Sequence, residues 1–530
     1  MITHRPATLD GVATLGDLTR FHARARGDQQ AMLFEGRSTS YGQLDLQANR
    51  VANGLLADGL KAGARVGFMD KNSDDFYRLV FGCAKAATVS VGINWRLAPP
   101  EVAYILNDSR AQILFVGPDF YPLAEQVADQ VPSLQRIIAM APGHARWQFF
   151  DDWLDEQSDA DPQIPVATDD VAIQMYTSGT TGHPKGVQLM HRCFFDLWRQ
   201  PPADDMAFND WSESDVNLVA MPSFHIGGVG WGLMGLRPGA RNIVVREFDP
   251  GVTLDMIAQH GISKLFLVPA AIRMVLQHPQ ARHTDYSSVR FICYGASPIP
   301  LDLLREAIEV FQCGFVQLYG MTETTGSATY LPPEDHAVAG NDRMRSAGKP
   351  FPGVRIKVVD EQGEPVPARQ VGEICIASPV NMLGYWNLPE ATHSTLVDGY
   401  VHTGDAGYLD EDGYVYVHDR VKDMIVSGAE NIYPAEVESA LFGHPAVADV
   451  AVIGVPDERW GEAVKAMVVC KPGAEVTVEE LLGFARQRIA GFKLPKSIDF
   501  IDDLPRNPSG KILKRELRKP YWEGRERNVN

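Results

Sequence analysis

The strongest constraint on the fold is an apolar run that leads directly into a loop of small and hydroxylated residues. Residues 171–176 (VAIQMY) read as a buried strand, and turn-forming residues follow at once. The loop offers backbone N–H groups, hydroxyl groups and one lysine, which suits a polyphosphate. It differs from a Walker A loop because Pro184 precedes Lys185 and Gly186 follows it. The predicted phosphate-binding residues are Thr177, Ser178, Gly179, Thr180, Thr181, Gly182 and Lys185.

A mobile polar loop after a strand is the alternative interpretation of this segment. A plain Gly/Ser/Thr tract would fit that alternative, but this tract closes on Pro-Lys-Gly at residues 184–186. The pattern therefore favours phosphate binding.

Four further segments accompany the loop, and together they resemble a known pattern. They are YGMTE at 319–323, HTGD at 402–405, DRVKD at 419–423 and PRNPSGK at 505–511. On these five segments, in this order, the chain resembles the superfamily of adenylate-forming (ANL) enzymes. That superfamily includes acyl-CoA synthetases, the adenylation domains of peptide synthetases and beetle luciferases. Residues 91–96 and 422–434 look most like fatty-acyl-CoA ligases.

Composition limits the class of protein and its partners. A chain of 530 residues exceeds what one hydrophobic core normally supports, so at least two domains are expected. Apolar residues make up 45% and charged residues 22%, which indicates globular structure. The net charge of −18 argues against nucleic acid as a partner, because backbone binding needs clustered positive charge. Anionic ATP and CoA would therefore be held by local basic groups and backbone amides.

Cysteine spacing and the N-terminus indicate the compartment. No C-x-x-C pair occurs, so free thiols are favoured over disulfides or zinc, and His183, His191 and His402 lack metal-ligand spacing. The N-terminus lacks the apolar run of a signal peptide, and polar residues interrupt the longest apolar stretch, 216–236. We expect a cytoplasmic protein, monomeric or homodimeric, with possible peripheral membrane contact.

Alternating strand and helix patterns predict an α/β protein with a large N-terminal domain. Residues 40–330 read as parallel sheets covered by helices, and the similar plans of 64–94 and 215–245 suggest two related α/β subdomains. A small β-rich subdomain is expected at 346–419, and a small mobile α+β domain follows. We place the boundary after residue 420, giving domains 1–420 and 421–530, with Lys422 at the hinge.

The resemblance implies roles in nucleotide binding for two further groups of residues. It gives Tyr319 an adenine-stacking role, Thr322 a hydrogen bond to the α-phosphate, and Asp405 and Arg420 contacts with the ribose hydroxyls. The segment at 295–298 resembles the edge of the adenine and acyl sites, although Ser297 is a mild departure from the family pattern. The remaining expected contacts are Gly295, Ala296, Gly320 and Met321.

Activation of a carboxylate at the α-phosphorus of ATP brings two anions together, so a lysine and Mg²⁺ are required. The resemblance assigns the catalytic lysine to Lys511, in a loop of the C-terminal domain that can reach across to the other domain. It assigns the metal to Glu323, with help from Thr177, because hard oxygen ligands suit Mg²⁺. A surface lysine and an acidic residue in the first turn of a helix are the respective alternatives.

The resemblance implies an acyl pocket at residues 221–231 and a thiol-guiding loop at residues 427–434. His225 resembles the residue that flanks the carboxylate, and Gly227, Gly228 and Trp231 would line the pocket, with a structural histidine and a core tryptophan as alternatives. The resemblance gives the loop Ser427, Gly428 and Ala429 a role in guiding the CoA thiol. One small domain cannot present both this loop and Lys511 to the adenylate, so a large rotation is implied.

The resulting prediction is an ATP-dependent acid:CoA ligase that releases AMP and pyrophosphate, acting on medium- to long-chain fatty acids. Its cofactors and co-substrates would be ATP, Mg²⁺ and CoA. An aryl-acid CoA ligase is the first alternative. A stand-alone adenylation enzyme that loads a carrier protein is the second, and a luciferase-like oxidase is disfavoured.

Overall fold

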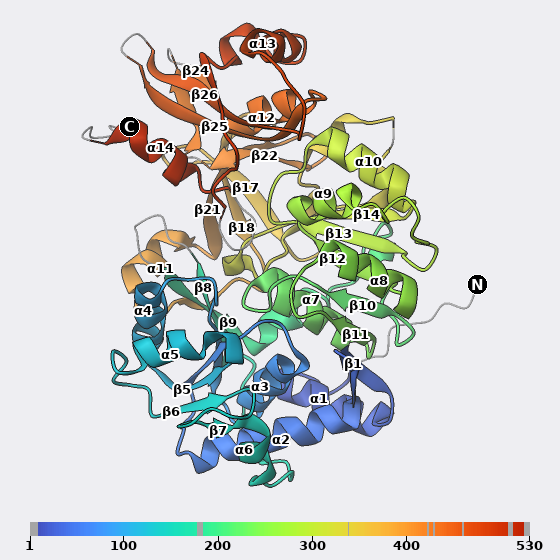
Figure 1. The fold of residues 1–530 in the computed structure, drawn as a ribbon, viewed down its shortest axis with the longest axis vertical. Helices are drawn as coiled ribbons and strands as arrows, with labels where there is room; N and C mark the ends of the chain where they lie inside the picture. The colour runs from blue at the N-terminus through green and yellow to red at the C-terminus, as the bar shows by residue number, and fades with distance from the viewer. Residues whose placement is uncertain are drawn as a thin grey trace.

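The computed structural model describes residues 9–177, 184–337, 339–420, 423–427, 430–457, 460–506 and 512–523. Two large sheets lie side by side in the N-terminal part, a smaller β-rich region lies above them, and the C-terminal residues form the top of the molecule (Figure 1).

The first sheet has eight strands in the order β19-β9-β8-β4-β3-β5-β6-β7. Strands β3 to β8 run parallel, whereas β9 is antiparallel to β8 and β19 is antiparallel to β9. The strands are β3 (Arg65–Met69), β4 (Val89–Gly92), β5 (Ala111–Val116), β6 (Arg136–Ala139), β7 (Gln148–Phe149), β8 (Val171–Thr177), β9 (Lys185–Met190) and β19 (Gly384–Tyr385). Their helices include α3 (Asp74–Lys85), α4 (Pro99–Ser109), α5 (Tyr121–Ala128) and α6 (Phe150–Asp155).

The second sheet has nine strands in the order β16-β15-β14-β13-β12-β10-β11-β1-β2. Its six central strands are parallel, and β2, β15 and β16 are antiparallel. The strands are β1 (Gln30–Phe34), β2 (Arg37–Ser40), β10 (Val216–Val219), β11 (Arg241–Val244), β12 (Lys264–Leu267), β13 (Phe291–Gly295), β14 (Gly314–Tyr319), β15 (Thr329–Leu331) and β16 (Lys349–Pro350). Its helices are α7 (Ile226–Leu236), α8 (Pro250–His260), α9 (Pro269–Gln277) and α10 (Leu301–Phe311).

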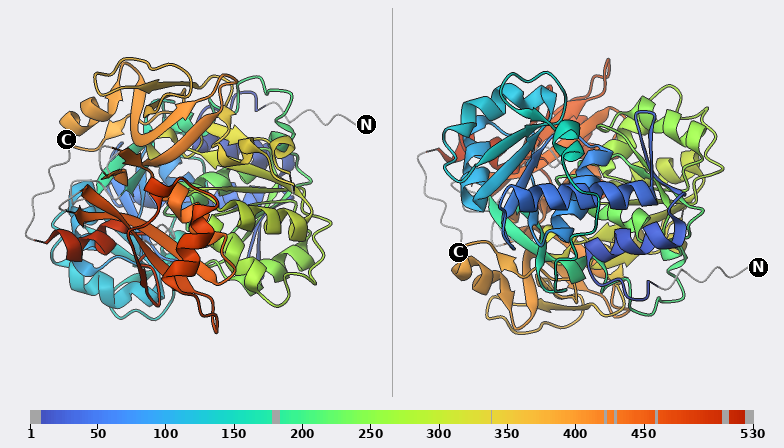
Figure 2. Two further views of the ribbon diagram at one scale, coloured as in Figure 1. Left: turned by 90° about the horizontal axis from the view of Figure 1, so that it is seen from above. Right: turned by 90° about the horizontal axis from the view of Figure 1, so that it is seen from below.

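The two sheets share a repeated unit, as the sequence predicts. The units β3–α3–β4 and β10–α7–β11 have the same strand–helix–strand plan, one in each sheet. Helices α3 and α7 meet closely, because a side chain at Gly232 would overlap the hydroxyl of Tyr77. Helices α1 (Leu15–Arg26) and α2 (Tyr41–Ala57) cross the underside of both sheets (Figure 2).

The β-rich region is shorter than predicted at its N-terminal end. It contains β17 (Arg355–Val359), β18 (Gly372–Ala377), β20 (Leu396–Val397), β21 (Tyr400–Leu409) and β22 (Val415–Arg420). The expected start at 346 is wrong because β16 joins the nine-stranded sheet instead. The β21–β22 hairpin turns at Gly413, whose φ of 82° is a conformation that glycine adopts readily.

The C-terminal part is a second layered unit with its own core. Five strands, β23 (Ile425–Ser427), β24 (Glu430–Ile432), β25 (Val447–Asp457), β26 (Gly461–Cys470) and β27 (Ser497–Phe500), form one sheet. Its helices are α12 (Pro434–Phe442), α13 (Val478–Arg486) and α14 (Lys514–Trp522). Thr477 caps α13 through a capping box with Glu480. The helix ends at Arg486.

The N-terminal and C-terminal parts have separate hydrophobic clusters. One buried cluster runs from Val12 to Val415 and covers both large sheets and the β-rich region. Another runs from Ile425 to Ile498. The predicted boundary at residue 420 lies between these clusters, and Lys422 lies outside the described residues. The division into domains 1–420 and 421–530 stays a prediction.

The free cysteines and the folding of the apolar stretch at 216–236 are typical of a globular protein. All six cysteines are free, and Cys83, Cys193, Cys293 and Cys375 are buried. The stretch folds as strand β10 and the 11-residue helix α7. Within the described ranges, none of the helices is long and apolar enough to cross a bilayer.

Candidate active site

A cavity of about 1520 Å³ lies at the carboxyl ends of the parallel strands. Val268, Ala296 and Gly320 line it, and each directly follows a strand of the nine-stranded sheet. Thr177, the last residue of β8 in the other sheet, also lines it. Open α/β sheets bind ligands at this edge, so the topology itself places a binding site here.

The two ends of the predicted phosphate loop meet at the cavity wall. Thr177 and Lys185 are register partners in the β8–β9 pair, and both line the cavity. Lys185 Nζ lies 4.8 Å from the centre of the Tyr385 ring, a cation–π contact. The other predicted residues, Ser178, Gly179, Thr180, Thr181 and Gly182, lie outside the described residues.

Glu323 is a buried carboxylate beside this loop. It lies in a three-residue 3₁₀ turn, Thr322–Thr324, and only 4% of it is exposed. Its Oε1 accepts a 2.8 Å hydrogen bond from the hydroxyl of Tyr385. Because one 3₁₀ turn has a small dipole, the alternative of an acid at a helix start explains this burial poorly. Gly320, Met321 and Thr322 line the cavity next to it.

Tyr319 and Asp405, predicted from separate motifs, are in direct contact. The hydroxyl of Tyr319 donates a 2.7 Å hydrogen bond to Oδ2 of Asp405, which is buried. Thr403 positions Asp405 by accepting its backbone N–H at 3.0 Å, and it donates to the carbonyl of Ile374 at 2.7 Å. Arg420 is the register partner of Asp405 on β22, but its side chain lies outside the described part of the structure.

The 295–297 turn reaches the cavity through one residue. Ala296 lines the cavity with φ of 68°, in the left-handed region. Gly295 packs so closely that a side chain there would overlap the carbonyl of Leu318. Ser297 is the last residue of this turn and does not line the cavity.

An apolar arm of the cavity starts at the N-terminus of α7. His225, Gly227 and Gly228 line it. Six apolar residues continue the wall: Ile226, Phe266, Val268, Ala270, Ala271 and Met274. Met274 is 46% exposed, so the arm reaches the molecular surface at this end.

His225 lies at the entrance to the apolar arm as a neutral imidazole. Burial, together with the nearby positive charge of Arg96, lowers its pKa to about 4. Its Nε2 is buried and has no hydrogen-bond partner among the described residues. An imidazole of this kind can serve as a hydrogen-bonding group for a ligand entering the arm.

Two of the predicted pocket residues have packing roles. Trp231 is buried among Trp211 and Phe266, and its indole N–H donates to the carbonyl of Leu218 at 3.1 Å. It does not reach the cavity, which favours the core-tryptophan alternative. A side chain at Gly228 would overlap the carbonyl of Pro222, so this glycine is required by backbone contact. Gly227 is different, because a Cβ added there would lie 3.1 Å from the edge of the Phe266 ring, which is a side chain and not backbone.

The C-terminal part closes the cavity. Met424 and Tyr433 line it, and the Tyr433 ring stacks on His418 of β22 at 4.3 Å between centroids. Asp423 pairs with Arg518 of α14 at 2.8 Å. Ser427 is buried at the end of β23. Gly428, Ala429 and Lys511 lie outside the described residues.

Tyr385 is the functional candidate that the sequence patterns missed. It lines the cavity and touches both Glu323 and Lys185. Its strand, β19, pairs with β9 although almost 200 residues separate the two strands in the chain. No local spacing predicts such a contact. The only sequence signal is a Gly-Tyr pair after a strand.

Comparisons with known proteins agree with this geometry. The sequence model of the AMP-binding enzyme family matches residues 19–386, and that of the AMP-binding enzyme C-terminal domain matches 436–511. The fatty acid–[acyl-carrier-protein] ligase ScoC of Streptomyces coeruleorubidus is 45% identical over 518 residues, 98% of each chain. A feruloyl-CoA synthase of Amycolatopsis sp. is 39% identical over 508 residues, 96% of this chain and 99% of its own.

The fold also matches solved structures. The crystal structure of the anthranilate CoA ligase AuaEII in complex with anthranoyl-AMP superposes with a TM-score of 0.89. The sequences are 28% identical, and the match covers 96% of this chain and 97% of that one. The chain therefore belongs to the AMP-binding enzyme family and is an AMP-forming ligase that joins a carboxylic acid to a thiol.

Proposed function

We propose that this enzyme activates a medium- to long-chain fatty acid with ATP and transfers the acyl group to CoA. In the first step a carboxylate oxygen attacks the α-phosphorus and pyrophosphate leaves. In the second step the thiolate of CoA attacks the acyl carbon and AMP leaves. The observation that carries the choice of acid is the apolar arm that begins at His225.

The arm suits a chain more than a compact ring. The six apolar residues named for this wall carry no charge, although Arg246 and Glu247 also line the cavity, and the wall reaches the surface at Met274. Each methylene group buried along such a wall contributes roughly 0.8 kcal/mol, so a long chain gains affinity continuously. His225 at the entrance would lie beside the carboxylate, where a neutral imidazole adds no charge of its own.

The nucleotide would occupy the polar end of the cavity. Thr177, Lys185 and the loop 178–182 would hold the phosphates, and Thr322 the α-phosphate. Tyr319 would stack on adenine, with Gly295, Ala296, Ser297, Gly320 and Met321 along its edges. Asp405 and Arg420 would bind the ribose, because a carboxylate accepts hydrogen bonds from both hydroxyls of a diol. The contact between Tyr319 and Asp405 supports this arrangement, since it joins two groups whose chain neighbours Gly320, Gly404 and Ala406 line the cavity.

The residues present fit a magnesium ion beside the phosphates. Glu323 offers a carboxylate and Thr177 a hydroxyl, and hard oxygen donors of this kind suit Mg²⁺ together with substrate phosphates and water. When bound, the ion would neutralise phosphate charge. Tyr385 would orient Glu323 through its hydrogen bond and Lys185 through its ring.

The C-terminal part would alternate between two tasks. Lys511 would bridge the acyl carboxylate and the α-phosphate during adenylation, and Ser427, Gly428 and Ala429 would guide the thiol afterwards. A rotation at Lys422 would exchange them. Separate cores on the two sides of residue 420 support this, because each part can move without opening its own interior.

Two alternatives follow from particular relatives. The 45% identical ligase named for a carrier protein favours the same acid class with a carrier-bound thiol as acceptor. The feruloyl-CoA synthase favours an aromatic acid. Both keep the adenylate chemistry and differ in one substrate each.

The test is a product assay that varies one substrate at a time. The enzyme with ATP, Mg²⁺ and dodecanoic acid should form AMP and an acyl-thioester in equal amounts when CoA is added. Holo acyl-carrier protein replaces CoA in a parallel reaction. Faster thioester formation with the carrier protein than with CoA would identify the carrier protein as the acyl acceptor. Turnover of ferulic acid alone would replace the fatty-acid assignment.

A further inference from the structure

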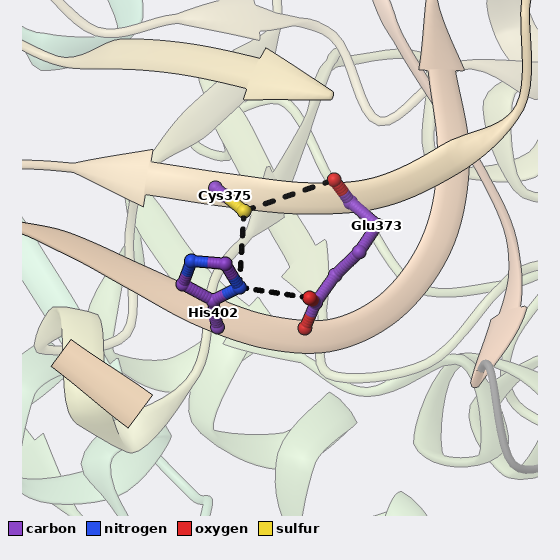
Figure 3. A group of neighbouring side chains, drawn as sticks. All are labelled: Glu373, Cys375 and His402. Carbon is purple, nitrogen blue, oxygen red and sulfur yellow. Dashed lines mark hydrogen bonds and ion pairs between the residues drawn. The ribbon is translucent and has the colours of Figure 1, made fainter. Parts of the chain in front are cut away.

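A glutamate, a cysteine and a histidine gather on the wall of the cavity, away from the residues given roles above. Glu373 and Cys375 lie on β18, and His402 lies on the neighbouring strand β21 (Figure 3). Cys375 and His402 are cross-strand register partners, and Glu373 lies two residues before Cys375, so both side chains are on the same face of β18. Sequence spacing could not show this, because the partners come from different strands.

Two of the three distances between ligand atoms are near those of a metal-ligand set. Cys375 Sγ lies 3.5 Å from His402 Nδ1, which lies 2.8 Å from Glu373 Oε2. One ligand atom from each residue lies within 4.8 Å of the other two. With Zn–S of about 2.3 Å and Zn–N of about 2.05 Å, a tetrahedral ion separates sulfur and nitrogen by about 3.6 Å. The imidazole and carboxylate need to part by only about 0.5 Å to reach their own tetrahedral spacing.

An ion could reach these ligands from the cavity. Glu373 and His402 both line it, whereas Cys375 is buried behind them. The carboxylate of Glu373 is held in place, because its Oε1 accepts the backbone N–H of Gly404 at 2.9 Å. The positive charge of Lys357, the register partner of Cys375 on β17, would oppose cation binding. Its Nζ, however, lies 4.6 Å from the centre of the Tyr400 ring.

We propose that Glu373, Cys375 and His402 form a binding site for a zinc-like divalent cation, with its fourth ligand position open to the cavity. Thiolate, imidazole and carboxylate together select a borderline ion such as Zn²⁺ over Mg²⁺. Binding must displace the thiol proton, and burial raises the pKa of Cys375 to about 12. Ion uptake therefore releases a proton and strengthens as the pH rises.

Occupancy of this site would affect the turn that carries Asp405. Glu373 holds both His402 and Gly404, and Asp405 follows them directly. An ion bound by Glu373 and His402 would alter these contacts and therefore the conformation of the turn that carries Asp405. This consequence rests on the proposed role of Asp405 in ribose binding, whereas the ion site itself does not.

Co²⁺ is the probe for the site, because a Co²⁺–thiolate bond gives a charge-transfer band in the near ultraviolet. The full chain, reduced and freed of metals, is titrated with Co²⁺ without oxygen and then with Zn²⁺. We expect a band that saturates at one Co²⁺ per chain and disappears when Zn²⁺ is added. Cys375→Ser should lack the band, and Glu373→Gln should weaken Co²⁺ binding at least about tenfold, the loss seen when even an outer-shell partner is removed.

The matched control is Cys470→Ser, which removes a half-buried cysteine from another sheet and should keep the band. Cys375→Ala is the second variant if the serine variant is unfolded by circular dichroism. Absence of the band in the folded wild type, or its persistence without Cys375, would overturn the proposal. The effect of the ion on the turn that carries Asp405 is tested by ATP binding. Zn²⁺ should weaken ATP binding more in the wild type than in Cys375→Ser. Equal weakening would assign the effect to Zn²⁺ bound to the nucleotide.

Discussion

The hydroxyl of Tyr385 donates a 2.8 Å hydrogen bond to Glu323, while the ring of the same tyrosine contacts Lys185 at 4.8 Å. One side chain thus joins the candidate metal ligand to the candidate phosphate-binding lysine. Because Tyr385 belongs to β19 and Lys185 to β9, the pairing of these strands fixes all three groups at the polar end of the cavity.

Loss of the Tyr385 hydroxyl should affect the magnesium requirement first. Tyr385→Phe keeps the ring beside Lys185 and removes the hydrogen bond to Glu323. A hydrogen bond of about 0.5–1.5 kcal/mol corresponds to a factor of about 2–10. We expect the Mg²⁺ concentration for half-maximal adenylation to rise by that factor, measured by acid-dependent ATP–pyrophosphate exchange. Glu323→Gln should shift it in the same direction and further.

Tyr121→Phe is the control, because its hydroxyl bonds Ala141 away from the cavity. An unchanged Mg²⁺ requirement in Tyr385→Phe would show that this hydrogen bond has only a structural role.

Removal of Lys511 should separate the two half-reactions. We expect Lys511→Ala to abolish adenylate formation and to retain most thioester formation from supplied acyl-AMP, because its charge is needed only while two anions approach. Rapid-quench assays of each step measure this. Equal loss in both steps would make Lys511 a general binding or folding residue.

The two glycines at the start of α7 should respond differently to substitution. Gly227→Leu places a side chain towards Phe266 in the apolar arm. Each methylene excluded from the arm forgoes roughly 0.8 kcal/mol, about fourfold in binding. kcat/KM for a long acid should therefore fall steeply while a short acid keeps most of its rate.

Gly228→Ala should instead lower the thermal stability and reduce activity on every acid, because its Cβ overlaps the carbonyl of Pro222. Equal losses on all chain lengths for Gly227→Leu would remove Gly227 from the acyl pocket.

Buried histidines should make the enzyme sensitive to acid. His191 is 1% exposed, its Nδ1 accepts the N–H of Leu15 at 3.2 Å, and burial lowers its pKa to about 4. Between pH 4 and 6.5 the unfolded chain binds this proton and the folded chain does not, so the free energy of unfolding falls as the pH falls. The slope is about 1.4 kcal/mol per pH unit. His191→Gln keeps an acceptor for Leu15 and cannot titrate.

The measurement is Tm at pH 7.5 and pH 5. The decrease should be smaller in His191→Gln than in the wild type, and equal decreases would contradict this explanation.

Local patterns predicted the architecture well because they depend on neighbouring residues. The strand at 171–176 and the two strand–helix–strand units are present. The family and the enzyme class were predicted from five motifs that occur in order along the chain. The start of the β-rich region was wrong, because β16 pairs with a distant strand.

Contacts between distant segments were beyond the sequence. Tyr385 reaches Glu323 across 62 residues, and Cys375 meets His402 only through the β18–β21 register. The glycines of α7 were interpreted as space for a ligand, whereas Gly228 and Gly232 serve close packing. A glycine in a sequence indicates that a side chain is excluded and leaves open whether a ligand or the protein itself excludes it.

A competition between two acids tests the proposed function most directly. The wild-type enzyme receives dodecanoic acid and ferulic acid at equal concentration, with ATP, Mg²⁺ and CoA, and mass spectrometry follows both acyl-CoA products. The ratio of their initial rates equals the ratio of kcat/KM. The apolar arm predicts that dodecanoyl-CoA forms faster, and that the preference falls as the fatty acid is shortened towards butyric acid. Faster formation of feruloyl-CoA, or a preference that does not change with chain length, would contradict the assignment of this arm to a fatty acyl chain.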